Sequence, residues 1–139
     1  MKKFWQVISK KDLIFGLIIL SLVVLNSFRP SNKVRFSFGE DSVDIRSTKF
    51  SMNVPYDMVD SLTLEEKPDM GIEVDGYYDR VIRTGTWKNE TWGEYTSCVE
   101  VYTDNCIVIK LTDGRYFVVS RRDNEETQRV YEEFLTYLK

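Results

Sequence analysis

A continuous apolar run near the N-terminus constrains the fold of this chain more than any other feature. Residues 13–25 read LIFGLIILSLVVL, and Ser21 is the only polar side chain among them. As a helix, residues 13–28 would be about 24 Å long, close to the ~30 Å hydrocarbon core of a bilayer. We therefore predict a transmembrane helix over residues 12–28, anchored at the headgroups by Trp5 and by neighbouring lysines.

A cleaved signal peptide and a buried core helix are the two alternatives for this run. The tripeptide at 25–27, Leu-Asn-Ser, is a poor match to a signal-peptidase site, and a core helix would rarely begin so close to a lysine-rich terminus. Four lysines precede the run, and Arg29, Lys33 and Arg35 follow it closely. The positive-inside rule then favours, by a small margin, an extracytoplasmic domain on a single-pass protein of the cell membrane.

The rest of the chain has the composition of one folded domain. The expected division is a basic segment at 1–11, the helix at 12–28, a linker at 29–32 and a domain at 33–139. Beyond residue 28 lie 15 of the 19 basic residues and 21 of the 22 acidic ones, so the domain is net acidic. An acidic domain is unsuited to nucleic acid, whose phosphates need a basic surface.

The chain contains no histidine. This excludes Ser–His and Cys–His catalysis as well as histidine-ligated zinc, and two cysteines alone cannot complete a structural zinc site. We therefore expect no catalytic residue, no cofactor and no metal, which argues for a binding protein rather than an enzyme.

Period-two alternation of apolar residues predicts strands from residue 33 to residue 120. The apolar positions in the first half are Val34, Phe36, Phe38, Val43, Ile45, Phe50, Met52, Val54, Leu62 and Leu64. The stretch 57–79 holds eight carboxylates, and we predict a short strand near 62–65 followed by an acidic loop. That loop suggests either a calcium or carboxylate site or, more simply, a solvated surface.

The Asp-Gly pair at 113–114 is the strongest short hairpin signal in the sequence. A two-residue turn there would pair Leu111 with Tyr116 and Ile109 with Val118. A three-residue turn at 103–105 would pair the preceding strand with the one that begins near residue 106, so that their apolar residues share one face.

In that arrangement the two cysteines, Cys98 and Cys106, would lie about 13 Å apart along the ladder. A disulfide needs Cα atoms closer than about 7 Å, so we expect two ordinary strand cysteines.

The last segment, 123–138, is predicted to be an amphipathic helix. Asp123 or Asn124 can cap it, and Val130, Phe134 and Leu138 repeat at helical spacing.

The order of elements resembles that of a pleckstrin-homology (PH) domain, and locally the sequence is similar to small, membrane-anchored members of the bacterial PH family. The matching segments are Phe36-x-Phe38, Asn53-Val54-Pro55-Tyr56, the hairpin from Ile107 to Tyr116, and Val118-x-Ser120 leading into the helix. The resemblance implies a mainly β fold at 33–139: an antiparallel PH-like barrel of about seven strands capped by the C-terminal helix. The first turn, Gly39-Glu40-Asp41, is acidic where a phosphoinositide pocket needs basic residues, which argues against phosphoinositide binding.

Two groups of apolar side chains are the candidate interaction surface. Trp87, Trp92 and Tyr95 cluster around a turn, where they form either a binding surface or packing over the barrel edge. Val108, Phe117 and Val119 are predicted to lie on the face opposite Ile109, either as an exposed patch or beneath the terminal helix.

A further candidate is the pair Arg121 and Arg122, which precedes the terminal helix and would either bind an anion at its N-terminus or form ion pairs with nearby glutamates.

The function that best fits these features is a membrane-anchored, non-catalytic interaction module that binds a protein partner. One alternative is an accessory subunit of a membrane complex that acts through its helix, where Gly16 and Ser21 would allow close packing. A second alternative is a membrane-tethered enzyme that uses the carboxylates of 57–79.

Overall fold

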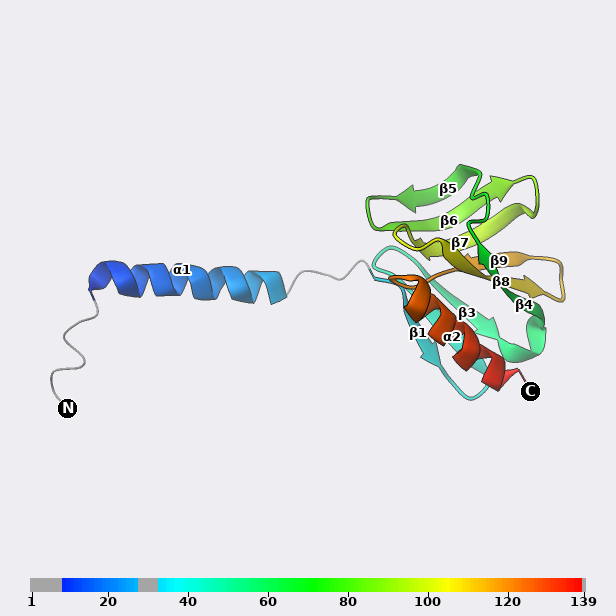
Figure 1. Cartoon of the computed structure of the whole chain (residues 1–139), viewed down its shortest axis with the longest axis horizontal. Helices are drawn as coiled ribbons and strands as arrows, with labels where there is room; N and C mark the ends of the chain where they lie inside the picture. Colours follow the sequence, from blue (N-terminus) through cyan, green and yellow to red (C-terminus); the bar gives the residue numbers. More distant parts are fainter. Residues whose placement is uncertain (1–8, 28–32, 139) are drawn as a thin grey trace. The chain divides into compact units, whose positions relative to one another are not determined.

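The structure, a computed structural model, describes residues 9–27 and 33–138, which belong to two separate units. The first unit contains the helix α1 (Lys10–Ser27), and the second is a β domain that ends in the helix α2 (Asn124–Tyr137) (Figure 1). The nine strands of the domain are β1 (Arg35–Phe38), β2 (Ser42–Arg46), β3 (Ser51–Pro55), β4 (Val59–Glu66), β5 (Ile72–Tyr78), β6 (Ile82–Asn89), β7 (Gly93–Glu100), β8 (Asn105–Leu111) and β9 (Tyr116–Val119). A single turn of 3₁₀ helix, η1 (Tyr56–Met58), joins β3 to β4.

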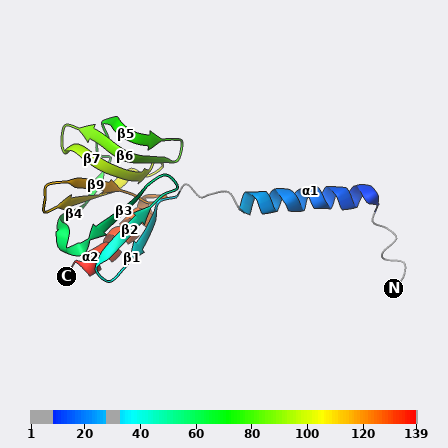
Figure 2. The same ribbon diagram turned by 180° about the vertical axis from the view of Figure 1, so that it is seen from behind.

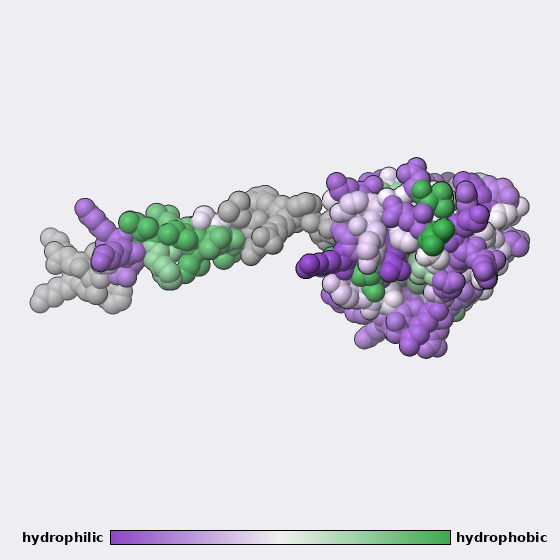
Figure 3. Space-filling model, turned by 90° about the horizontal axis from the view of Figure 1, so that it is seen from above, coloured by the Kyte–Doolittle hydropathy of each residue, from purple (hydrophilic) through white to green (hydrophobic). Residues whose placement is uncertain are grey.

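Helix α1 begins in a capping box. The Ser9 hydroxyl accepts a hydrogen bond from the Asp12 backbone N–H at 3.2 Å, and the Asp12 carboxylate accepts one from the Ser9 N–H at 3.1 Å. Ten large apolar side chains of the helix are exposed, by 45 to 66 % of their area, and Figure 3 shows this apolar surface in green.

The predicted transmembrane helix at 12–28 is wrong. Among the described residues, no helix is both long enough and apolar enough to cross a membrane. The physical reason is that Lys10, Lys11 and Asp12 occupy the first turn. The apolar run at 13–25 is therefore only about 20 Å long, against a hydrocarbon core of ~30 Å. Of the other N-terminal predictions, the basic segment is described only from residue 9, and Trp5 and the linker 29–32 lie outside the described residues.

The described strands form two sheets, which corrects the predicted seven-stranded PH-like barrel. One sheet has three strands in the order β1-β2-β3, and the other has six in the order β4-β8-β9-β7-β6-β5. Every pairing is antiparallel except that of β7 with β9, which is parallel. The mainly β class and the C-terminal helix agree with the sequence prediction, whereas the strand number and the connectivity do not.

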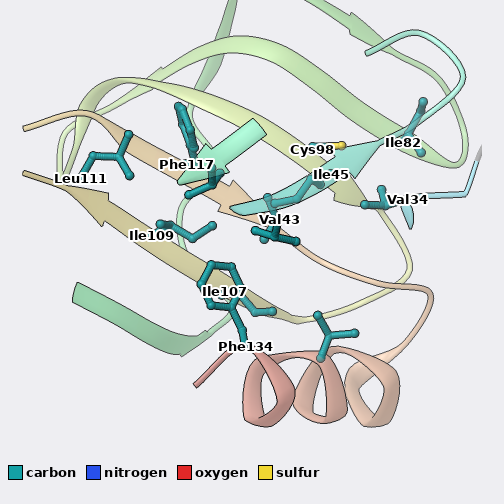
Figure 4. Close-up of a cluster of buried hydrophobic side chains, with 13 residues drawn as sticks. Val34, Val43, Ile45, Ile82, Cys98, Ile107, Ile109, Leu111, Phe117 and Phe134 are labelled. Atoms are coloured by element: carbon teal, nitrogen blue, oxygen red, sulfur yellow. The ribbon is translucent and has the colours of Figure 1, made fainter. Parts of the chain in front are cut away.

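The main core lies between the two sheets and α2. Val43 and Ile45 of the small sheet, Ile107 and Ile109 of the large sheet and Phe134 of α2 are all fully buried, and Figure 4 shows how these side chains converge. Burial of side chains of this size contributes roughly 1.5–3 kcal/mol each, so this cluster holds the two sheets together.

The six-stranded sheet curls around a second apolar cluster. The connection 67–71 joins β4 and β5, which lie at opposite edges of the sheet. Six Cα–Cα steps span at most about 20–22 Å, whereas five strand spacings in a flat sheet measure about 24 Å. The sheet must therefore bend towards this connection. Asp69 and Met70 hold it in place through their carbonyls, which accept hydrogen bonds from the Asn89 amide and the Tyr95 hydroxyl respectively.

The turn at 112–114 has three residues rather than two. Leu111 donates to the Arg115 carbonyl at 2.9 Å, and Gly114 takes a positive φ of 89°. The extra residue shifts the register by one, so that Ile109 pairs with Phe117 instead of Val118. Strand β9 also lies between β7 and β8, so the predicted hairpin of these two strands across 103–105 does not form.

Helix α2 forms where the sequence places it. The Asp123 carboxylate accepts a hydrogen bond from the Glu126 N–H at 2.8 Å, and the apolar stripe buries Val130 and Phe134. Figures 1 and 2 show α2 beside β1 and the three-stranded sheet, away from β5 and β6.

Candidate functional site

The aromatic residues predicted as a binding surface lie mostly inside the domain. Trp87 and Tyr95 are 6 % and 3 % exposed and belong to the second apolar cluster, while Trp92 is half-buried against them. The Trp92 and Tyr95 rings meet edge to face with their centroids 5.2 Å apart. Because the curled sheet and the connection 67–71 cover this cluster, it stabilises the fold and does not form an accessible surface.

The predicted apolar patch of Val108, Phe117 and Val119 is also buried. Phe117 and Val119 face the main core together with Ile109, whereas Val108 faces the second cluster. The sequence prediction placed all three opposite Ile109, either exposed or beneath the terminal helix, because it assumed a two-residue turn. The observed three-residue turn moves Phe117 and Val119 to the inner face.

The acidic stretch 57–79 forms most of two strands, β4 and β5, rather than a loop. In the described parts of the chain, no three acidic or cysteine side chains gather closely enough to hold a metal ion. Asp79 accepts hydrogen bonds from the Val81 and Ile82 N–H groups at 2.7 and 2.9 Å, and these bonds lower the pKa of its carboxyl. Asp79 therefore stabilises the β5–β6 turn.

The two cysteines lie on opposite faces of the large sheet, Cys98 towards the main core and Cys106 towards the second cluster. Both thiols are free and buried, and burial raises the pKa of each to about 12.

The site that the structure does provide is a groove of about 490 Å³ between β1 and α2, which we call the basic groove. Its cationic residues are Lys33, Arg35, Arg121 and Arg129. Its other lining residues are Phe36, Phe38, Val130, Glu133 and Tyr137. The domain as a whole is acidic, whereas this groove has an excess of positive charge, although Glu126 and Glu133 form ion pairs with Arg121 and Arg129.

The inner end of the basic groove is fixed by a clamp on Val34, which is fully buried. The Arg121 guanidinium donates a hydrogen bond to the Val34 carbonyl, and the Val34 N–H donates to the Glu100 carboxylate. Arg121 also pairs with Glu126 at 3.8 Å. The predicted alternatives for Arg121 were an anion site and an ion pair. The structure shows the ion pair and also brings Arg121 into the groove.

Arg122, the other member of the predicted pair, is not among the groove-lining residues. It forms an ion pair with Asp123 at 3.4 Å, and its side chain is 63 % exposed.

Among the described strands, β1 pairs only with β2, so its other edge is open towards the groove. Gly39 donates to the Ser42 carbonyl, and the register pairs Ser37 with Asp44. Hydrogen-bonded and non-hydrogen-bonded positions alternate along an antiparallel pair. The backbone N–H and C=O groups of Phe36 and Phe38 therefore point away from β2, in the same direction as those of Val34.

The far wall of the groove comes from α2 and is held by aromatic contacts and ion pairs. The Tyr137 ring stacks on Phe38 with centroids 5.0 Å apart, and on Tyr56 at 5.3 Å. Arg129 is held along the helix by Glu126 at 3.1 Å and by Glu133 at 3.4 Å. Aromatic packing thus sets the distance between the helix and the edge strand.

Arg35 lies directly opposite Arg46 in the β1–β2 register, although like charges in that position destabilise a sheet. Arg46 is compensated by Asp44 at 3.5 Å. The side chain of Arg35 is exposed and lines the groove. Arg35 therefore adds positive charge to the groove at some cost to the sheet.

Of the groove cations, only Arg121 was predicted from the sequence as a candidate binding residue. The others are separated along the chain, with Lys33 and Arg35 before β1 or within it and Arg129 in α2, and they meet only because α2 packs beside β1. The basic pair Lys33 and Arg35, in an otherwise acidic domain, was the one local sequence signal that indicated a positively charged site here.

Comparison of the chain with protein-family models, with curated proteins and with solved structures finds no match. The resemblance to bacterial PH domains therefore remains a prediction from the sequence motifs, and the geometry of the groove is the basis for a functional proposal.

Proposed function

We propose that the β domain is a non-catalytic interaction module that binds an extended, acidic segment of a partner protein in the basic groove. The observation that carries this proposal is an open strand edge beside four cations. An extended peptide can add to such an edge through main-chain hydrogen bonds, while neighbouring side chains select its sequence.

Charge and shape support the same occupant. Lys33 and Arg35 at one wall and Arg121 and Arg129 at the other would attract carboxylates that project from a peptide. Phe36, Phe38 and Tyr137 supply apolar surface for the intervening side chains. A groove of about 490 Å³ has room for a few residues of an extended chain.

The proposal is tested with the full chain in a neutral detergent and a fluorescent peptide of alternating glutamate and valine. We expect saturable binding that weakens as salt is added, and no binding of the peptide with lysine in place of glutamate. Arg35→Gln should reduce affinity about tenfold, the cost of one charge-assisted hydrogen bond. Arg115→Gln removes the same charge at the distant 112–114 turn and should leave affinity unchanged.

Strand addition is tested separately from charge. Methylation of alternate amide nitrogens in the peptide removes main-chain donors but keeps every carboxylate. Two peptides are compared, one methylated at its odd-numbered and one at its even-numbered amide nitrogens. We expect only one of them to lose binding, because only alternate N–H groups of an added strand face β1. Equal affinity for both peptides, or for wild type and Arg35→Gln, would show that the groove does not bind a peptide in this way.

We also propose that α1 attaches the module to a membrane. Ten exposed apolar side chains on one helix are unfavourable in water, and lipid would cover them. The full chain should float with phosphatidylcholine vesicles, whereas a chain that begins at residue 29 should not. α1 can also be replaced by an unrelated apolar helix. If the replacement restores flotation but not the biological activity of the full chain, the accessory-subunit alternative is favoured, because that alternative requires the particular sequence of α1.

A further inference from the structure

A second pocket, of about 210 Å³, opens on the opposite side of the six-stranded sheet from the main core. Its lining includes Lys67 and Met70 from the connection 67–71, Arg83 from β6, Val99 from β7 and Cys106 from β8. The basic groove faces the main core side, so this pocket is independent of the function proposed above.

Arg83 lines this pocket and forms no ion pair with any described residue. Its guanidinium sits over the rings of Tyr78 and Trp87, at 5.1 and 5.7 Å from their centroids. Its Nε is buried and has no hydrogen-bond partner, and within the described residues no carboxylate comes within ion-pair distance of it. A buried donor of a charged group that stays unpaired is costly, and an anion beside the guanidinium would offset the uncompensated charge.

Lys67 brings a second cation to the same pocket in a strained conformation. Its φ of 45° is the one positive value among the described non-glycine residues. The Lys67 N–H donates to the Asp104 carbonyl at 2.8 Å, which fixes this turn at the pocket wall. Glycine would adopt this backbone without strain, so a lysine at this position lowers the stability of the fold.

The carboxylates near this pocket limit the size of the anion that it can bind. Glu100 lines the pocket, but its carboxylate accepts from the Val34 N–H and interacts with Arg121 on the other side of the sheet. Asp104 also lines the pocket and is exposed, and Glu65 lies near Cys106. These two acids would oppose a large anion, whereas a phosphate-sized group could remain near Arg83 and Lys67.

We propose that this pocket binds a small oxyanion of the phosphate class, held by the planar guanidinium of Arg83 and by the Lys67 ammonium. Arginine offers paired N–H donors that match two oxygens of such a group, and lysine adds a mobile point charge. These two cations would bind inorganic phosphate and the phosphate group of a small ester in the same way.

The test uses the full chain, labelled with ¹⁵N, in a neutral detergent, and follows the arginine Nε–H signals by nuclear magnetic resonance. Inorganic phosphate should shift the Arg83 signal in a saturable way, while chloride at equal ionic strength should not. Glycerol phosphate is titrated in parallel: tighter binding than inorganic phosphate assigns the site to an ester, and weaker binding assigns it to the free ion. No saturable shift with either compound would overturn the proposal.

A variant separates binding from folding. Lys67→Gly removes the cation and relieves the positive φ, so it should raise the melting temperature while it weakens phosphate binding about tenfold. Lys88→Gln removes the same charge from an exposed position on β6 and should change neither quantity. Unchanged phosphate affinity in Lys67→Gly would show that Lys67 does not take part in the site.

Discussion

The Arg121 guanidinium donates a hydrogen bond to the backbone carbonyl of Val34, 87 residues earlier in the chain. The N–H of the same Val34 donates to the buried carboxylate of Glu100. One residue at the start of the β domain is thus held by two charged side chains, one from the end of β7 and one from the junction between β9 and α2. The clamp fixes β1 beside α2, and the basic groove depends on that spacing.

The first prediction concerns Arg121. Arg121→Gln should lower the free energy of unfolding by about 2–3 kcal/mol, because it removes the bond to Val34 and leaves the Glu100 carboxylate without its main cation. Urea unfolding followed by circular dichroism measures the change. Arg122→Gln is the matched control, since that side chain is 63 % exposed and pairs only at the surface; it should cost less than about 1 kcal/mol. Similar losses in both variants would contradict the clamp.

The second prediction concerns pH. Burial raises the pKa of the Glu100 carboxyl above its ordinary value of 4.5, although Arg121 and the Val34 N–H oppose the shift. The folded state therefore holds a proton more tightly than the unfolded state, so the contribution of Glu100 to stability is present below pH 4.5 and is lost as pH rises through the folded pKa.

Glu100→Gln tests this sign, because the amide does not titrate. The stability of the variant relative to wild type should rise as pH increases from about 4.5 through the folded pKa of Glu100. Asp79, Asp113 and Asp123 have lowered pKa values and act in the opposite direction, but they are common to both proteins and cancel in the difference. A constant difference across the window would show that the pKa of Glu100 is the same in the folded and unfolded states.

The third prediction concerns Gly85, which has a φ of +93° and faces Gly76 across the β5–β6 pair. A Cβ at Gly85 would lie 2.6 Å from the Gly76 Cα and 2.7 Å from the Asp75 carbonyl oxygen, and both are backbone atoms. Gly85→Ala should therefore separate β5 from β6 and cost about 3 kcal/mol or more, the sum of strain and lost pairing.

Gly114→Ala is the control for the strain alone. Its φ of +89° is similar, but a Cβ there would meet nothing within 4 Å. We expect a cost of about 1–2 kcal/mol from the left-handed conformation. Thermal unfolding of the two variants measures the contrast. Equal costs would mean that β5 adjusts to the added methyl group without loss of pairing.

Local chemistry explains which elements were predictable. The helix α2 was found because its cap at Asp123 and its stripe through Val130 and Phe134 are properties of consecutive residues. Strands β1 to β4 were found because one face of each meets the main core, which produces alternation. Strand β5 was missed because its short alternation, Ile-Glu-Val-Asp, is followed by Gly76 in a stretch rich in acidic residues, and these residue types are typical of a loop. Nearly all its residues are exposed, so burial adds no further pattern.

Contacts between segments that are distant in the sequence explain the features that could not be predicted. Nothing near residues 103–105 indicates that β9 would insert between β7 and β8, since that order is decided by packing over the whole sheet. The sequence around residues 112–114 is compatible with a two-residue or a three-residue turn, and the burial of Phe117 and Val119 favours the longer one. The basic groove needs α2 beside β1, so it is visible only in the folded chain.

The fourth prediction concerns the cysteines. Burial raises the pKa values of Cys98 and Cys106 to about 12, so almost no thiolate is present at neutral pH. Both thiols should resist a thiol-reactive dye in the folded protein and react quickly in denaturant, which absorbance measures directly. Tyr102→Cys, at a side chain that is 72 % exposed, is the control and should react at once without denaturant. Rapid labelling of either native thiol would mean that the sheet opens on the face where it lies. Labelling of Cys98 alone would place the opening between the two sheets, and labelling of Cys106 alone would place it at the curled face beside the Arg83 pocket.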